Sequence, residues 1–335
     1  MCKQFWVGVD LAKDSFVASV ASVEHQPSEW ASLPVREFTN NGHGLLSFLA
    51  WLEKHNVNRE VVSGVCLEAT GRLAWRWGER VGDRLGPLSI VNPARPVAFA
   101  KSIGLRDKTD RIDACVLALY GAAMRPVSKP LPTSYERQLR ELASLCESVK
   151  QDRIASENRL REKPESKVVR KCLRRQMVHL ARELECLETE MDTLIAQNAT
   201  LEQHRVRIQT IPGVGAKTAR MLLAEYGDLR EYSRNELVAL AGLYPKHFQS
   251  GSSVHKKPRL AKGGGRRIRA VLYMAALTAR RFCPHLKRFA QRLKERGMSN
   301  MAILGAVMRK LLLLIRAVVV SGNAYDPHFG LEQSP

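Results

Sequence analysis

Residues 5–10, Phe5-Trp6-Val7-Gly8-Val9-Asp10, form an apolar run that ends in a carboxylate. We expect this run to be a central strand of a sheet. A second apolar run, residues 61–67, is followed by Glu68 and is typical of a strand buried on both faces. Asp110 and Asp113 open an expected helix and, three residues apart, face the same side of it. The sequence therefore predicts four carboxylates at the ends of three elements.

Each acid also has a structural explanation. Asp110 with Asp113 resembles a helix cap followed by an acidic residue, and Asp107 or Thr109 could be the cap instead. A lone aspartate at a strand end, such as Asp10, often only closes a turn. Glu68 is more indicative, because ligands bind beyond the carboxyl ends of sheet strands. Gathered carboxylates repel one another unless a cation lies among them, so the joint pattern favours a hard divalent ion and phosphodiester chemistry.

The charge of the chain points to a polyanionic partner. Lys and Arg number 53 against 33 acids, which gives a net charge of +20 over 335 residues. Such an excess favours nucleic acid through counterion release. We expect no membrane insertion, because the most apolar stretch, residues 311–320, is short and contains Arg316. Without a signal peptide or a Cys-x-x-Cys pair among its seven cysteines, the chain is expected in the cytoplasm, at the bacterial nucleoid.

Three parts are expected along the chain. Residues 1–125 alternate strand and helix signals and predict a mixed α/β sheet with packed helices. Residues 133–205 contain leucines at helical spacing and a break near Pro164. They predict two long helices, either as an antiparallel hairpin or as a coiled coil with another chain. A solvated helical spacer is the alternative. Residues 206–325 read as a basic, mostly helical region.

A glycine-rich turn opens this third part at residues 211–215. Gly213 and Gly215 permit a tight turn that exposes the N–H groups of the next helix to a phosphate. This resembles a helix-hairpin-helix motif, and Lys217 and Arg220 favour that interpretation. A plain turn between helices is the equal alternative.

A serine-rich segment precedes a basic one. Ser250, Ser252 and Ser253 flank a glycine, a composition that on its own is typical of a flexible linker. The stretch from Lys256 to Arg296 contains a single acid, which favours contact with nucleic-acid phosphates over mere solvation. The residues expected to bind nucleic acid are Gly213, Gly215, Lys217, Lys256, Lys257, Arg259, Lys262, Arg266 and Arg267.

With these pieces in place, the chain resembles the DEDD-type insertion-sequence transposases, a group that includes the Piv-like DNA invertases. The first half matches in residues 8–13, 67–71 and 108–114. The second half matches in residues 211–215, 241–245 and 249–251. One departure is Ala261, where relatives typically carry a serine.

The resemblance implies a RuvC-like, ribonuclease-H-type domain in which Asp10, Glu68, Asp110 and Asp113 bind Mg²⁺, with Mn²⁺ as a substitute. It implies a coiled-coil region that assembles a dimer or tetramer. It also implies a C-terminal transposase domain with Ser250 as nucleophile, while Ser252 and Ser253 stay open as alternatives. Donor and target DNA and a noncoding bridge RNA are the partners it suggests.

The expected function is a recombinase that cuts and rejoins DNA through a covalent phosphoserine intermediate. One alternative is a metal-dependent nuclease that acts on branched DNA by water attack and needs the same acids but no serine. A second is a non-catalytic nucleic-acid-binding protein that assembles through the long helices. That alternative predicts that all four acids are dispensable.

Overall fold

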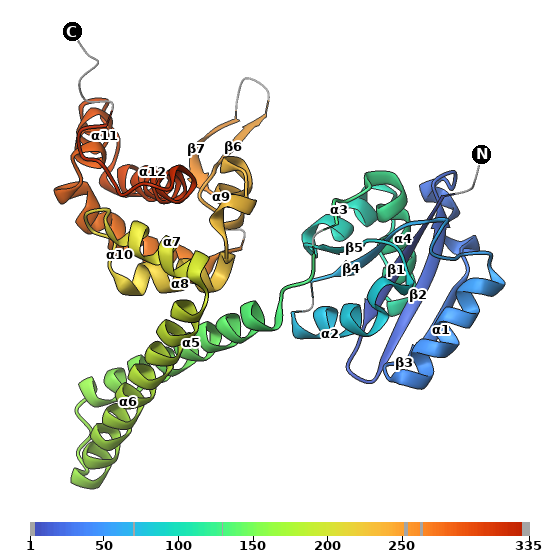
Figure 1. The fold of residues 1–335 in the computed structure, drawn as a ribbon, viewed down its shortest axis with the longest axis horizontal. Coiled ribbons are helices and arrows are strands. Elements are labelled where there is room, and N and C mark those ends of the chain that lie inside the picture. Colours follow the sequence, from blue (N-terminus) through green and yellow to red (C-terminus); the bar gives the residue numbers. More distant parts are fainter. Residues whose placement is uncertain (1–3, 70, 129, 251–253, 262–263, 330–335) are drawn as a thin grey trace. The chain divides into compact units, whose positions relative to one another are not determined.

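The computed structural model describes residues 4–69, 71–128, 130–250, 254–261 and 264–329, without the side chains of residues 72, 83, 247–250 and 254–258. The chain divides into two compact units, residues 1–132 and 133–335 (Figure 1). This division coincides with the start of the second predicted part at residue 133. The boundary predicted at residue 205 falls within a helix of the second unit.

A five-stranded mixed sheet forms the centre of the first unit. Its strands are β1 (Phe5–Leu11), β2 (Ser15–Ser22), β3 (Val35–Thr39), β4 (Val62–Glu68) and β5 (Leu88–Val91). They are ordered β3-β2-β1-β4-β5, with β2 antiparallel to both β1 and β3, and with β4 parallel to β1 and β5. The strands predicted at residues 5–10 and 61–67 are present as β1 and β4, and the α/β fold class is confirmed.

Helices cover both faces of the sheet (Figure 1). On one face, α1 (Gly42–Lys54) and α2 (Arg72–Val81) pack against Val7, Val9 and Leu67. On the other face, α3 (Ala94–Ser102) and α4 (Asp110–Met124) pack against Trp6 and Cys66. Because side chains alternate along a strand, these contacts show on which face of the sheet each strand residue lies.

Two glycines let α4 lie directly on β1. A β-carbon built on Gly8 would overlap the backbone of Ala114 and Ala118, and one built on Gly121 would overlap the ring of Trp6. Residue 121 therefore contacts residue 6, and residue 114 contacts residue 8. The helix α4 thus runs antiparallel to the strand β1. This direction brings the first turn of α4 to the carboxyl end of β1.

The second unit is helical and contains one hydrophobic core. Helices α5 (Ser134–Arg161) and α6 (Lys167–Gln197) pack along each other as a hairpin, with Leu139 and Cys146 buried beside Met191 and Ile195 (Figure 1). The same core includes residues of α7 (Ala199–Gln209), α8 (Ala216–Tyr226), α9 (Arg234–Leu240), α10 (Arg266–Phe282), α11 (Pro284–Glu295) and α12 (Asn300–Ser321).

A β-hairpin interrupts these helices and was not predicted. Strands β6 (Pro245–Ser250) and β7 (Val254–Leu260) pair antiparallel, with Ser250 opposite Val254. Ser250 thus ends a strand, where the sequence indicated a flexible linker. Among the helices that the structure describes, none is long and apolar enough to cross a bilayer.

Candidate active site

The register of the central strands places Asp10 and Glu68 at the same edge of the sheet. β1 and β4 run parallel with Val9 opposite Leu67, so the next residue of each strand is one of the two acids. Trp6 and Cys66 face α4, and alternation directs Asp10 and Glu68 to that same face. Local sequence places both acids at strand ends, and strand pairing makes them neighbours.

The first turn of α4 brings the other two acids to this edge. Thr109 caps the helix, since its hydroxyl accepts a hydrogen bond from the N–H of Ile112 at 3.2 Å. The interpretation of Asp110 as the cap is therefore wrong, and Asp110 and Asp113 lie within the helix as acidic residues of its first turn. Negative charge is favourable there because of the helix dipole.

Electrostatics show that the four acids share one environment. Burial raises the pKa of Asp10 from 3.8 to about 6, and the charges of Asp113, Asp110 and Glu68 add to this rise, in that order. Burial also raises the pKa of Asp113, whereas the nearby cation of Lys108 lowers it, with Nζ 4.0 Å from Oδ2. A bound cation would relieve this repulsion, so the site favours a positive ligand.

A small cavity of about 160 Å³ opens beside the acids. Glu68 and Asp113 line it together with Lys101, Arg106 and Lys108. These three cations were not among the predicted site residues. The available signal was their position immediately before the acidic helix, in the stretch from residue 101 to 108. Carboxylates next to cations are suited to a metal ion and the phosphate that it contacts.

The donor set fits a hard divalent ion. All four groups supply carboxylate oxygens, the ligands that Mg²⁺ and Mn²⁺ prefer. Among the described residues, no three acidic, histidine or cysteine side chains already stand as a preformed metal cage. Mg²⁺ is commonly held by one or two carboxylates, with water and substrate phosphate completing its shell. The acids therefore suit an ion that binds together with its substrate.

The turn between α7 and α8 has a packing role at Gly213. This residue has a φ of +90°, and a β-carbon there would lie 2.5 Å from the backbone nitrogen of Ala279 in α10. Gly215 is different, because it caps α8 with a φ of −92° and a β-carbon there would meet open space. The structure thus explains Gly213 by close packing. Gly215 keeps the exposure that the phosphate-binding interpretation needs.

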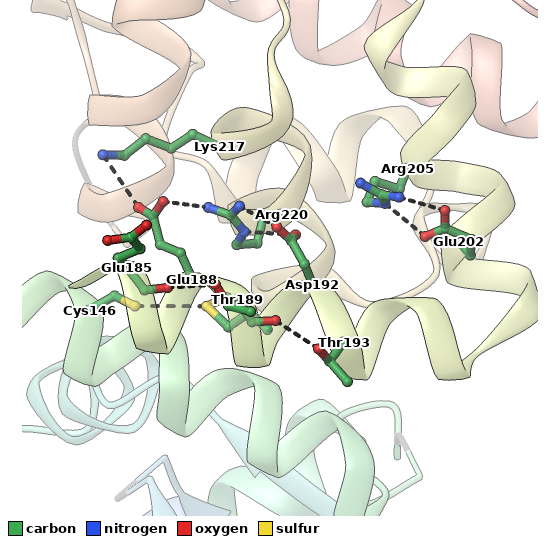
Figure 2. Close-up of polar contacts among 11 residues, drawn as sticks. Cys146, Glu185, Glu188, Thr189, Asp192, Thr193, Glu202, Arg205, Lys217 and Arg220 are labelled. Atoms are coloured by element: carbon green, nitrogen blue, oxygen red, sulfur yellow. Dashed lines mark hydrogen bonds and ion pairs between the residues drawn. The ribbon is translucent and has the colours of Figure 1, made fainter. Parts of the chain in front are cut away.

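Figure 2 shows that Arg220 faces protein carboxylates of α6. Its guanidinium donates to both oxygens of Asp192, at 2.9 and 2.5 Å, and also pairs with Glu188 at 3.0 Å. Only 7% of Arg220 is exposed, so this residue no longer supports the interpretation of the turn as a phosphate-binding motif. Lys217 is exposed and lies 3.9 Å from Glu188.

The predicted nucleophile lies at the end of β6. The structure describes the backbone of Ser250, Lys256 and Lys257 but not their side chains. Ser252, Ser253 and Lys262 lie outside the described residues. Arg259 and Arg266 are exposed, while Arg267 pairs with Glu225 at 3.4 Å.

Comparison with known proteins gives two family matches that together span most of the chain. Residues 7–163 match an IS110 DEDD transposase domain, described as "Transposase". Residues 205–291 match the domain described as "Transposase IS116/IS110/IS902 family". The first match contains all four acids, and the second contains the glycine-rich turn and Ser250. DEDD transposase domains depend on a divalent metal, in agreement with the donor set.

Curated relatives agree with these matches. The pilin gene-inverting proteins of Moraxella bovis and Moraxella lacunata are each 31% identical over 324 residues, which cover 96% of this chain and 97% of theirs. The "Transposase for insertion sequence element IS1328" of Yersinia enterocolitica is 29% identical over 99 residues, 29% of this chain and 28% of that protein. Matches of this extent set aside the non-catalytic alternative. The chain belongs to the family of DEDD-type insertion-sequence transposases and Piv-like DNA invertases, and is an enzyme of the transposase and site-specific recombinase class.

Proposed function

We propose that this enzyme cuts and rejoins DNA strands with Mg²⁺ held by Asp10, Glu68, Asp110 and Asp113, and that Mn²⁺ substitutes for it. The observation that carries the proposal is the strand register that makes Asp10 and Glu68 neighbours at one sheet edge, and the charges of Asp113, Asp110 and Glu68 all add to the raised pKa of Asp10. When bound, the metal would polarise a phosphodiester and stabilise the charge on the leaving oxygen. Lys101, Arg106 and Lys108 line the same cavity and orient the phosphate by charge.

We assign the nucleophile to Ser250, on the strength of the family resemblance. In this step a bond forms between Oγ of Ser250 and phosphorus, the bond from phosphorus to the sugar oxygen breaks, and that oxygen takes up a proton while the serine proton passes to solvent. The phosphoserine ester conserves the energy of the broken bond, so that another strand's hydroxyl can reverse the attack. Ser252 and Ser253 are the alternative positions.

The partners that we propose are donor DNA, target DNA and a noncoding bridge RNA that pairs with both. Gly215, Lys217, Lys256, Lys257, Arg259, Lys262, Arg266 and Arg267 would contact backbone phosphates, and Gly213 would shape the turn beside them. Relatives named for gene inversion and for transposition support DNA as the substrate. A dimer or tetramer would bring together the strands to be exchanged.

The test is a search for covalent protein–DNA adducts on a denaturing gel, with nicked DNA that prevents rejoining. Ser250→Ala should abolish the adduct, while Ser252→Ala and Ser253→Ala should retain it. An adduct that persists in Ser250→Ala would refute this assignment.

The second candidate is a metal-dependent nuclease that uses water. The clustering of the four acids favours it equally, because that cluster needs no serine. It predicts strand cleavage without any adduct in the wild-type protein. The same gel therefore separates the two mechanisms.

A further inference from the structure

Helix α6 changes charge abruptly along its length. Residues 167–182 contain six Lys or Arg and no acid, whereas residues 183–192 contain five acids and no Lys or Arg. The basic half includes Lys167, Arg170, Lys171, Arg174, Arg175 and Arg182, which we call the basic stripe. Their spacing repeats every three or four residues, so they share one face of the helix.

The acidic half has partners within the protein. Glu188 pairs with both Lys217 and Arg220 of α8, and Asp192 pairs with Arg220, as Figure 2 shows. The basic stripe lacks such partners: among the described residues, Lys167, Lys171, Arg174, Arg175 and Arg182 form no ion pair within 4.0 Å. Arg170 donates one hydrogen bond, to the backbone oxygen of Pro164 at 3.0 Å.

This arrangement opposes the stability of the helix itself. Lys167 with Lys171, and Lys171 with Arg175, are like charges four residues apart, each of which costs roughly 0.2–0.5 kcal/mol. Cations near the start of a helix also meet the positive end of its dipole, and the first turn of α6 contains no acid. The stability of helix α6 therefore does not explain why basic residues occupy these positions.

Packing gives no reason either. The hairpin uses the opposite side of α6, where Leu173 is buried, while the stripe is exposed except for half-buried Arg170. The stripe forms an open surface to which, among the described residues, no other helix contributes side chains. Val178 and His179 are the remaining residues of this surface.

We propose that the basic stripe binds the phosphate backbone of a nucleic acid without reading its sequence. Its ends lie about 22 Å apart at the helical rise of 1.5 Å per residue. A B-form duplex of that length carries roughly 13 phosphate charges, enough to meet every cation of the stripe. No Phe, Tyr or Trp lies between residues 167 and 182, so base stacking is not the main mode of contact. The proposal does not depend on the serine or on the metal.

The experiment compares two variants of the full-length protein with equal loss of charge. Lys171→Gln/Arg174→Gln/Arg175→Gln removes half of the stripe, and glutamine keeps helix propensity. Lys54→Gln/Arg59→Gln/Arg84→Gln removes three exposed cations of the first unit as the matched control. Binding to a random-sequence DNA duplex and to an unstructured RNA is measured in EDTA as salt is varied.

We expect the slope of log affinity against log salt to become shallower by about 2.7 for the duplex or about 2 for the RNA, in the stripe variant alone. A change with the duplex only would assign the stripe to DNA, and a change with RNA only would assign it to RNA. Equal slopes for the stripe variant, the control and the wild type would overturn the proposal. The proposal would also be overturned if the stripe variant kept the wild-type slopes with both nucleic acids but lost binding to anionic lipid vesicles.

Folding of the stripe variant is checked by thermal unfolding. Because the variant removes like-charge repulsion, its melting temperature should be raised at low salt, and this gain should shrink at high salt. The single change Arg174→Gln serves as a milder variant, with an expected slope change of about 0.9 on the duplex.

Discussion

Gly8 of β1 and Ala118 of α4 meet backbone to backbone, with no room for a side chain between them. This contact holds α4 against the sheet and thereby sets the position of its first turn, which carries Asp110 and Asp113.

Gly8→Ala should therefore disturb both the fold and the site. We expect a loss of about 1–3 kcal/mol in the free energy of unfolding, because a methyl group would force the helix away from the strand. Gly42→Ala is the control, since a β-carbon there meets nothing within 4 Å. Urea unfolding measures both variants. Equal stability of the two would contradict the close contact.

Asp10→Asn should stabilise the metal-free protein and abolish strand cleavage. The pKa of Asp10 in the folded state, about 6, lies above its ordinary value of 3.8. Its stabilising contribution is therefore complete below pH 4 and lost as pH rises through 6. Asparagine should restore roughly 1–2 kcal/mol at pH 7 in EDTA, after allowance for solvent screening.

Added Mn²⁺ provides the second half of that measurement. It should raise the unfolding free energy of the wild-type protein and raise that of Asp10→Asn less, because binding to the folded state stabilises it. Equal stabilisation of both proteins would remove Asp10 from the metal site.

Strand cleavage should rise between pH 5 and pH 7. Asp10 must lose its proton to bind a cation, and its pKa of about 6 places the midpoint in this range. Higher Mg²⁺ concentrations should move the midpoint to lower pH, because metal and proton compete for the same oxygens. A midpoint that does not respond to Mg²⁺ would show that another group controls the rate.

Arg220→Met should cost about 3–5 kcal/mol, since it leaves Asp192 and Glu188 without their shared cation. Lys217→Met is the matched control, because this side chain is 59% exposed and its pairing should contribute about 1 kcal/mol or less. Thermal unfolding compares them. A small loss for Arg220→Met would mean that the contacts in Figure 2 do not hold α8 on α6.

Sequence patterns predicted the first unit well, because long apolar runs make its strands and polar side chains cap two of its helices, α1 and α4. Asn41, a residue type typical of helix starts, caps α1 with its side chain accepting from the N–H of Gly44. The four acids were predicted as site residues from their places at element ends. Their mutual approach depends on strand pairing and on the contact at Gly8, which no local pattern reveals.

The second unit was less predictable. β6 and β7 contain lysines, two histidines and Pro258 where an apolar alternation would have marked strands, so no strand was predicted there. The helix break at Asn198, whose side chain caps α7, was likewise missed, because helical spacing of the apolar residues continues around it. Arg220 looked like a phosphate ligand because its carboxylate partner Asp192 lies 28 residues away in sequence.

Placement of the acids by helix packing also determines which insertions the enzyme tolerates. An extra residue in the loop at 103–108 would lengthen only the approach to α4, and the carboxylates would keep their positions. An extra residue between Asp113 and Ala118 would rotate the first turn by about 100° and direct its acids away from Asp10. Among related proteins, insertions and deletions in this domain should therefore occur in the loop before α4 and be absent from the first two turns of the helix.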